Sequence, residues 1–379
     1  MKRKLFTPGP TPLPPEVRMA EAKEIIHHRD KEFVKVFQEV RKGLKYVFQT
    51  GNEVLTLTAS GTGAMEAVVV NLLSPEDKIL VVRGGKFGER WAEIGTSFGL
   101  KVNCVDIEWG KTINPHLIEK ELARDPGIKA VFTQLVETST GVVYDIKSIA
   151  KIVKDREVVL VVDAISGLGA EFLPTDEWEV DVVVGGSQKA LMIPPGLAFV
   201  SLSDKAQSLV EKSTLPKYYW SFEKALKMQE NNQTPYTPAV SLICALRESL
   251  RLIKEEGRDN ILKRHALLAE ATREGVLAMG LKIFSEVPSA VVTAVKLPSG
   301  IEDKSLRTLM RDEYGVLIAG GQGKLKGKII RIAHLGWMDA LDIIAGISSL
   351  EMALSRIGFR VRLGEGVKAA EEVLLRRKR

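Results

Sequence analysis

Short runs of β-branched residues alternate with helical patterns between residues 53 and 202, and this alternation limits the possible folds more than any other feature. Strands of this length that are separated by helical segments are typical of parallel sheets, in which helices cross from one strand to the next. The predicted strands cover residues 53–58, 78–82, 101–107, 130–136, 157–162, 180–184 and 197–202. We therefore predict an α/β fold whose large domain contains a mainly parallel, seven-stranded sheet.

The pattern changes after Gly257 to a mixture of helices and strands that is typical of an α+β domain. A chain of 379 residues is also long enough for two domains. The proline-rich opening at 7–15 predicts extended backbone, because proline interrupts helices. We divide the chain into an extended N-terminal segment at 1–20, a large domain at 21–257 and a smaller α+β C-terminal domain at 258–379. The N-terminal segment is expected to contribute to the small domain and to the functional site.

Composition and charge exclude several classes of protein. The chain is 45% hydrophobic and 27% charged, which argues against disorder. The net charge is +6, but the lysines and arginines are interspersed with acidic residues along the chain, so we expect no nucleic-acid partner. The one basic run, at 376–379, is interpreted as a solvated helix end. The longest apolar runs are too short to cross a membrane, and the N-terminus lacks a signal peptide, so a cytoplasmic location is expected.

Cysteine and histidine residues do not indicate a metal site. Cys104 and Cys244 are far apart and lie outside any CxxC pattern, so neither a disulfide framework nor a thiolate site is expected. The five histidines show no HExxH or paired spacing. We therefore expect no catalytic metal.

A lysine follows the predicted strand at 180–184, preceded by small polar residues and followed by a Pro-Pro-Gly turn. This residue is Lys189. An amine in a partly desolvated pocket has a lowered pKa and becomes a nucleophile toward carbonyls, as a Schiff-base lysine must. The alternative is a lysine that extends from the strand end into solvent, and the local sequence leaves both interpretations open.

An aspartate, Asp163, ends the apolar run that begins at residue 158. A carboxylate at a buried strand end needs a cation or a hydrogen-bond donor. A protonated pyridine nitrogen is such a partner, and a charged ring then withdraws electrons from a bound substrate. The alternative is an aspartate that caps a turn through its own backbone.

A strand followed by small residues and a helix carries the segment Ser60-Gly-Thr-Gly63. Free backbone N–H groups at a helix start, together with the Thr62 hydroxyl, form a site for a phosphate. The segment is neither a complete GxGxxG nor a GxxxxGK[ST] motif, which disfavours nicotinamide-binding and P-loop proteins.

In chain order, the Ser60 segment, Asp163 and Lys189 resemble the class V aminotransferases of pyridoxal-phosphate (PLP) fold type I. The resemblance is greatest to the serine–pyruvate and alanine–glyoxylate aminotransferase group. The matching segments extend over nearly the whole chain. They are Thr7-Pro-Gly-Pro-Thr11, His28-Arg29, Ser60-Gly-Thr-Gly63, Phe87-Gly-Glu-Arg90, Glu137-Thr-Ser-Thr-Gly141, Gly186-Ser-Gln-Lys189, Pro194-Pro-Gly196, Leu246-Arg-Glu-Ser-Leu250 and Arg331-Ile-Ala-His-Leu-Gly336.

The resemblance implies that Lys189 holds PLP as a Schiff base and that Asp163 contacts its ring nitrogen. The other cofactor-binding residues that it implies are Thr62, Gly63 and Ala64 at the phosphate, Gln188 beside the phosphate, Phe87 and Ile165 against the ring, and Ser139 near the phenolic oxygen. Phe87 stands where many relatives have tryptophan, and Ala64 where some have histidine. Core packing remains the alternative for Phe87 and Ile165.

The resemblance also implies a substrate site at Gly9 and Arg331, in which the arginine binds the α-carboxylate through a planar two-bond fork. A salt-bridged strand arginine is the alternative for Arg331. We interpret Arg29 and Arg90 as structural ion-pair partners.

The resemblance further implies a homodimer with shared sites, in which the loop at 231–238 gives a hydroxyl from Thr237, or less closely Thr234, to the neighbouring subunit's cofactor. The alternative for Thr237 is a helix N-cap before Pro238.

The predicted reaction is transamination between a small L-amino acid (serine, alanine or aspartate) and glyoxylate or pyruvate. Within the family, the alternatives are a cysteine desulfurase-like enzyme and a phosphonate aminotransferase. A desulfurase needs a mobile nucleophilic cysteine, whereas Cys244 lies in an amphipathic helical pattern. Outside the family, the alternatives are a nucleotide-binding dehydrogenase and a non-enzymatic regulatory module.

Overall fold

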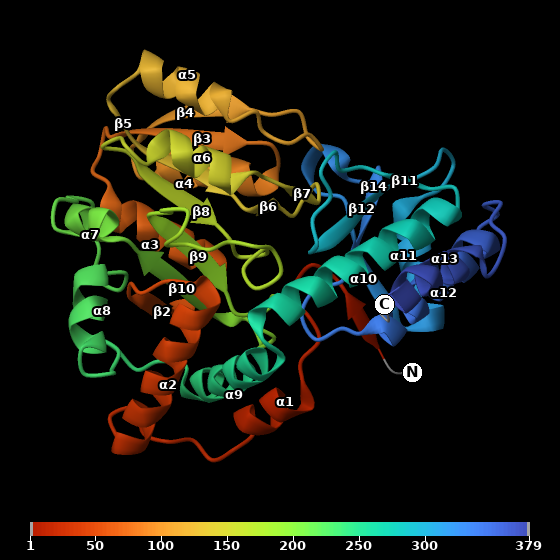
Figure 1. The fold of residues 1–379 in the computed structure, drawn as a ribbon, viewed down its shortest axis with the longest axis horizontal. Helices are drawn as coiled ribbons and strands as arrows, with labels where there is room; N and C mark the ends of the chain where they lie inside the picture. The colour runs from red at the N-terminus through yellow and green to blue at the C-terminus, as the bar shows by residue number, and fades with distance from the viewer. Residues whose placement is uncertain (1–2, 377–379) are drawn as a thin grey trace.

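The computed structural model describes residues 3–376, so most of the basic run at 376–379 lies outside the described residues. A seven-stranded sheet with the strand order β2-β10-β9-β8-β5-β3-β4 forms the large domain (Figure 1). Its strands are β2 (Val54–Ala59), β3 (Lys78–Arg83), β4 (Lys101–Asp106), β5 (Ile128–Gln134), β8 (Val159–Asp163), β9 (Val182–Gly186) and β10 (Gly196–Leu202). Only β10 runs antiparallel to its neighbours. The predicted α/β fold with a mainly parallel seven-stranded sheet is confirmed.

Helices cover both faces of this sheet, which explains why its strands are apolar along their whole length. Alternate residues of β8 face opposite cores: Leu160 and Val162 pack into one, whereas Val159 and Val161 pack into the other. The first core also contains residues of α2 (Lys31–Phe48), α5 (His116–Arg124), α6 (Ile146–Val153) and α9 (Val240–Glu256). The second contains residues of α3 (Gly61–Leu72), α4 (Lys86–Ser97), α7 (Asp204–Val210) and α8 (Phe222–Gln229).

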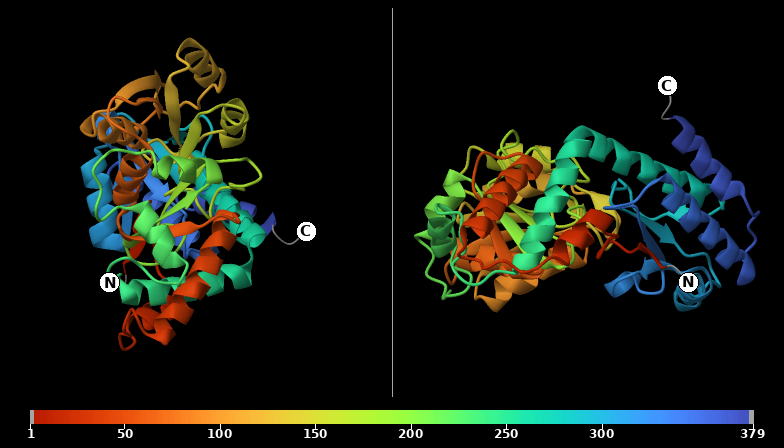
Figure 2. Two further views of the ribbon diagram at one scale, coloured as in Figure 1. Left: turned by 90° about the vertical axis from the view of Figure 1, so that its left-hand side faces the viewer. Right: turned by 90° about the horizontal axis from the view of Figure 1, so that it is seen from below.

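A second sheet, with the order β1-β13-β14-β12-β11, lies beside the large one (Figure 2). Its strands are β1 (Lys4–Phe6), β11 (Lys282–Ile283), β12 (Val292–Lys296), β13 (Val316–Gly320) and β14 (Ile329–Ala333). It packs with α10 (Arg258–Ala278), α11 (Asp303–Tyr314), α12 (Ala340–Arg356) and α13 (Glu365–Leu375). The smaller elements are α1 (Pro15–Glu21), β6 (Val136–Glu137), β7 (Val142–Val143) and the 3-10 turn η1 (Gly323–Leu325).

Strand β1 pairs in parallel with β13, so the N-terminal strand belongs to the second sheet although it comes first in the chain. The residues that follow β1 then pass toward the large sheet. Among residues 3–376, no helix is long and apolar enough to cross a membrane.

The strand directions place the predicted site residues at one edge of the large sheet. Strands β3, β5, β8 and β9 are parallel, and β2 shares their direction because β10 is antiparallel to both β2 and β9. Asp163 is the last residue of β8, Lys189 lies in the turn after β9, and α3 begins just after β2. Ligands of open α/β sheets bind beyond this carboxyl edge.

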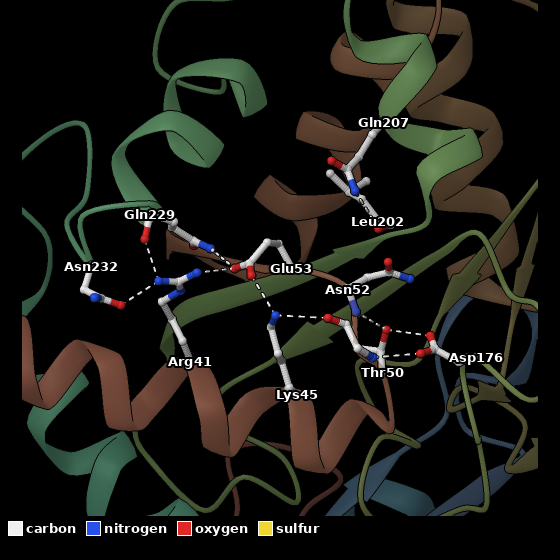
Figure 3. A network of polar contacts seen from close by, with 11 residues as sticks. Arg41, Lys45, Thr50, Asn52, Glu53, Asp176, Leu202, Gln207, Gln229 and Asn232 are labelled. Atoms are coloured by element: carbon white, nitrogen blue, oxygen red, sulfur yellow. Dashed lines mark hydrogen bonds and ion pairs between the residues drawn. The ribbon is translucent and has the colours of Figure 1, made fainter.

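A polar network connects α2, the start of β2 and the segment that leads into the loop at 231–238 (Figure 3). Glu53 accepts hydrogen bonds from Arg41 Nη2 (2.6 Å), Lys45 Nζ (2.6 Å) and Gln229 Nε2 (3.1 Å). Arg41 also donates to Asn232. Partial burial acts to raise the Glu53 pKa, but the hydrogen bonds from Lys45 and Arg41 outweigh it and hold the pKa below its ordinary value.

We expect Glu53→Gln to lower the free energy of unfolding at pH 7 by about 1–2 kcal/mol, because hydrogen bonds to a carboxylate are stronger than those to an amide. Since the folded-state pKa of Glu53 is depressed, its contribution is present above the unfolded-state pKa and is lost as the pH falls through the folded-state value. Urea unfolding at pH 7 and in acid measures both effects. Glu76→Gln is the control, because Glu76 pairs with Lys101 on the surface, where the two side chains are 72% and 58% exposed, and its loss should change stability little. Equal losses in the two variants would contradict the expectation.

Candidate active site

Lys189 is the buried amine at the centre of the site. It is only 8% exposed, and its Nζ donates to the backbone oxygen of Pro8. Burial lowers the Lys189 pKa to about 8, partly opposed by Asp163 and reinforced by the cations Arg331 and Arg90. The alternative of a lysine that extends into solvent is therefore wrong. A substantial fraction of this amine is neutral near pH 8, as a nucleophile requires.

Asp163 supplies a buried carboxylate near Lys189. Its Oδ1 accepts a hydrogen bond from the Ile165 backbone N–H at 2.9 Å. Burial raises the Asp163 pKa to about 6, although the Ile165 N–H acts in the opposite direction. The turn-capping interpretation is thus correct for one carboxylate oxygen. The carboxylate remains mostly ionised at neutral pH and can bind a cation.

The phosphate site was predicted at the start of α3. The first turn of α3 contains Gly61 and Thr62, and the backbone N–H groups of Gly63 and Ala64 donate to the Ser60 oxygen. Gly61 is required here, since a Cβ at this position would lie 2.4 Å from Ile165 Cδ1. Ile165, 8% exposed, therefore packs directly against the helix start, where a ring could rest on it.

Gln188 carries a buried polar atom that remains unsatisfied. Its Oε1 has no hydrogen-bond partner among the described residues. It is one of ten buried side-chain atoms without a partner among the described residues, so it does not by itself indicate a ligand. An exchange of the amide oxygen and nitrogen would turn this position into a donor toward an anion.

Ser139 and Phe87 meet at a carboxylate to which the sequence analysis assigned no role. Glu137 is completely buried and accepts hydrogen bonds from the Ser139 hydroxyl and N–H, from Phe87 N–H (3.1 Å) and from Gly88 N–H (3.1 Å). Burial raises the Glu137 pKa, whereas these donors lower it. The Ser139 hydroxyl also accepts from Lys86 N–H at 3.0 Å, so it caps the start of α4. Its contact with a cofactor oxygen remains a prediction.

Arg90 and Arg29 do not form the predicted ion pairs: no carboxylate lies within ion-pair distance of either guanidinium in residues 3–376. Arg90 Nη1 donates to Thr62 Oγ1 at 3.1 Å, and its guanidinium lies over the Phe87 ring at 4.9 Å from the centroid. Sequence could have indicated this position, because residues three apart in a helix share one face. Arg29 instead holds the loop at 231–238, donating to Gln233 Oε1 (3.0 Å) and to the Thr234 oxygen (2.8 Å).

Arg331 lies in β14 and points toward the large domain. It is 5% exposed, and it donates through Nε to the Gly320 oxygen (3.0 Å) and through Nη1 to the Thr138 oxygen (3.0 Å). Burial lowers the Arg331 pKa to about 10, although Glu137 raises it. No ion pair of Arg331 is present among residues 3–376, so the salt-bridged alternative is wrong. Its charge remains available to an anion.

The N-terminal segment lies directly on Lys189. A Cβ at Gly9 would be 2.6 Å from Lys189 Nζ, so only glycine allows this approach. The Thr11 hydroxyl donates to the Lys189 backbone oxygen at 3.0 Å. Both Pro8 and Thr11 contact Lys189, and both belong to the N-terminal segment that was predicted to contribute to the active site.

Among residues 3–376, no contact brings Thr234 or Thr237 to Lys189. Thr234 is 6% exposed and its hydroxyl donates to the Tyr236 oxygen at 2.8 Å. Thr237 is exposed, and its hydroxyl lies 3.5 Å from His28 Nε2. Thr237 is not a helix N-cap, because α9 begins at Val240 with Ala239 at the cap position.

These residues fit the cofactor that the resemblance implies. Lys189 supplies an amine for an aldehyde, and Asp163 supplies a buried carboxylate for a protonated ring nitrogen. At the start of α3, Ser60 already accepts from the Gly63 and Ala64 N–H groups, so the first-turn N–H groups of Gly61 and Thr62 are the ones suited to a phosphate. Among residues 3–376, no group of three or more His, Cys, Asp or Glu side chains is arranged to hold a metal ion.

Comparisons with known proteins agree with this geometry. The family described as Aminotransferase class-V matches residues 5–329. The chain is 44% identical to the soluble hydrogenase 42 kDa subunit of Anabaena cylindrica, covering 98% of both chains. It is 35% identical to the L-aspartate–glyoxylate aminotransferase of Paracoccus denitrificans, covering 97% of this chain and 95% of the other. The crystal structure of ureidoglycine–glyoxylate aminotransferase from Bacillus subtilis is similar at a TM-score of 0.95 and 29% identity, covering 99% and 98% of the two chains.

In the cofactor-free protein, we expect acetylation of Lys189 by trace acetic anhydride to increase as the pH passes through about 8, because only the neutral amine reacts. An ordinary lysine reaches this point near pH 10. Peptide mass spectrometry over a pH series gives the midpoint for each lysine. Lys154 is the control, since it is exposed and its pKa is raised by the hydrogen bond to Glu179. The same midpoint for both lysines would show that Lys189 is not activated.

Proposed function

Because the chain belongs to the class-V aminotransferases, which are PLP-dependent enzymes, we propose that it transfers an amino group between a small L-amino acid and glyoxylate or pyruvate. Serine, alanine and aspartate are the proposed donors. The observation that carries the proposal is that the Lys189 amine, the Asp163 carboxylate and the Arg331 guanidinium are all buried at one edge of the large sheet, close enough for Asp163 and Arg331 to affect the Lys189 pKa. When bound, PLP supplies an aldehyde that takes up the substrate amine and a ring that withdraws electrons from the α-carbon.

Lys189 is the proposed proton carrier. Transamination requires that a proton leave the substrate α-carbon and return elsewhere, and a nearby amine with a pKa of about 8 can both accept and release it near neutral pH. The burial that lowers this pKa also keeps bulk water from taking the proton.

Asp163 is proposed to hold the ring nitrogen in its protonated form. With Oδ1 fixed by the Ile165 N–H, Oδ2 is the atom that we assign to this contact. Its pKa of about 6 keeps the carboxylate charged above that pH, and a positive ring nitrogen beside it would lower the pKa further.

Arg331 is proposed to bind the substrate α-carboxylate. Its Nε and Nη1 are oriented by two neutral backbone oxygens, which fix the guanidinium plane without neutralising its charge. A carboxylate can therefore bind through the Nη1–Nη2 edge. Gly9, beside Lys189, forms the proposed opposite wall.

Glyoxylate is favoured as the acceptor by two of the similar proteins, whose names contain a glyoxylate aminotransferase activity. The name of the Anabaena cylindrica relative indicates other chemistry, but the amine and the carboxylate described above are the groups that transamination needs. The predicted cytoplasmic location remains a prediction.

Transamination is tested by incubating the PLP-loaded protein with glyoxylate and serine, alanine or aspartate, and measuring glycine and the new oxo acid by chromatography. We expect Lys189→Ala to reduce turnover by about a thousandfold or more, because it removes the proton carrier. We expect Asp163→Asn to retain PLP, measured by absorbance, but to reduce kcat by about a hundredfold, since an amide cannot stabilise the charged ring. Glu76→Gln serves as an exposed control. If wild-type protein forms no glycine from any donor, the proposed reaction is wrong.

We also propose a homodimer whose sites are shared through the loop at 231–238. The loop has its own anchor in Arg29 and presents an exposed threonine, Thr237. Beside it, the Tyr219 and Tyr236 rings stack at 5.3 Å, with Tyr218 72% exposed. Exposed aromatic groups are enriched in interfaces between subunits, so this surface is suited to a second copy. Thr237, rather than the buried Thr234, would then supply the hydroxyl.

Complementation between inactive subunits tests the shared site. We expect a mixture of Lys189→Ala and Thr237→Phe chains to regain activity, because one site of the mixed dimer combines Lys189 from one chain with Thr237 from the other. In the Thr237→Phe homodimer, both sites lack the threonine hydroxyl and contain a bulky ring in its place. Each homodimer alone is the control, and mass spectrometry under native conditions verifies exchange. Absence of recovery after verified exchange would rule out sharing through Thr237.

A further inference from the structure

Arg90 is the charged residue of the site to which the proposed reaction assigns no role. It lies in the first turns of α4, one helical turn after Phe87, so both side chains extend from the same face of the helix. Its Nη1 donates to Thr62 Oγ1 at 3.1 Å, and its guanidinium covers the Phe87 ring at 4.9 Å. One side chain therefore contacts two residues that were predicted to bind PLP.

The charge of Arg90 has no carboxylate partner within ion-pair distance among residues 3–376. Other charged residues nearby are paired: Lys86 binds Glu89 at 2.6 Å, and Arg83 at the end of β3 binds Asp106 at 2.6 Å. A neutral side chain could donate the hydrogen bond to Thr62 that joins α4 to α3, so this contact alone does not explain why the residue is a cation. Leaving a half-buried guanidinium without a carboxylate is unfavourable unless an anion binds nearby.

We propose that Arg90 is a positioning residue of the cofactor site, which orients the Thr62 hydroxyl and the Phe87 ring for the phosphate and the ring of PLP. The inference rests on the proposed function, because the two residues matter only if PLP binds at the start of α3. Arg90 acts in two separable ways. Its planar group holds Thr62 and Phe87, and its positive charge favours a bound anion.

The charge also acts on the reactive groups of the site. Burial is the main cause that lowers the Lys189 pKa, and Arg90 adds to it; for Asp163, burial raises the pKa and Arg90 opposes this. Removing the charge should therefore raise both pKa values. A residue with a purely structural role, far from the site, would change neither.

Two measurements on the cofactor-free protein test the proposal without any assay of turnover. The first is the apparent Kd for PLP, and the second is the pH midpoint of Lys189 acetylation by trace acetic anhydride. For Arg90→Gln, we expect the Kd for PLP to rise about tenfold or more, because a charge-assisted contact is lost. We also expect the labelling midpoint to move to higher pH.

Arg90→Lys separates the two effects. It retains the charge, so the labelling midpoint should remain near that of wild type, but a lysine cannot replace the planar guanidinium over Phe87, so the Kd should still rise. In the double variant Arg90→Gln with Thr62→Val, the two effects on Kd should not add, because both disrupt one contact. Arg83→Gln is the matched control, an arginine paired with Asp106 at the end of β3.

Wild-type values of Kd and midpoint in Arg90→Gln, equal to those of Arg83→Gln, would overturn the proposal. If Arg90→Gln does not fold, as judged by circular dichroism, the Kd of Arg90→Lys decides: an unchanged value means that Arg90 is not a positioning residue. If wild-type protein itself takes up no PLP at Lys189, the proposed function fails instead, and this outcome is distinguishable from failure of the inference alone.

Discussion

The burial of a primary amine is the constraint on which the rest of the site depends. Lys189 is kept at 8% exposure by the N-terminal segment and the turn after β9, and this burial is the main cause of its lowered pKa. A buried amine needs acceptors and a nearby negative charge, which Pro8 and Asp163 supply. Arg331 in β14 and Arg90 in α4 disfavour the protonated form of Lys189. The Lys189 pKa is therefore set by groups from both domains. The parallel sheet makes this possible, because it brings strand ends that are distant in sequence to one edge.

The fold could be predicted from sequence because its signal is periodic. The seven strands of the large sheet lie at the predicted positions within a few residues, since strands buried on both faces must be apolar throughout. Lys189 and Asp163 stood out for the same reason, as polar residues directly after such runs. Assigning them to a reaction, however, required the resemblance to a family, because the local sequence left both alternatives open.

Contacts between segments that are far apart in sequence could not be predicted in this way. Pro8 and Thr11 contact Lys189, and Glu137 joins Ser139 to the start of α4, but no spacing in the chain encodes these contacts. Arg90 was interpreted as a structural ion-pair partner, because nothing in its local sequence indicates another role. Its partners, the hydroxyl of Thr62 and the ring of Phe87, become visible only when α3 and α4 are packed together.

The pairing of β1 with β13 also determines when the site is completed during synthesis. Lys4 is made long before its partner Val316, so β1 must wait until the long segment between them has been made. Domains fold as they emerge, and long-range pairings form late because their loop-closure entropy must be overcome first. The large sheet, including Lys189, can therefore form while Pro8 and Gly9 are still unplaced. The amine is covered only when the second sheet closes, so a nascent chain has a more open site than the finished protein.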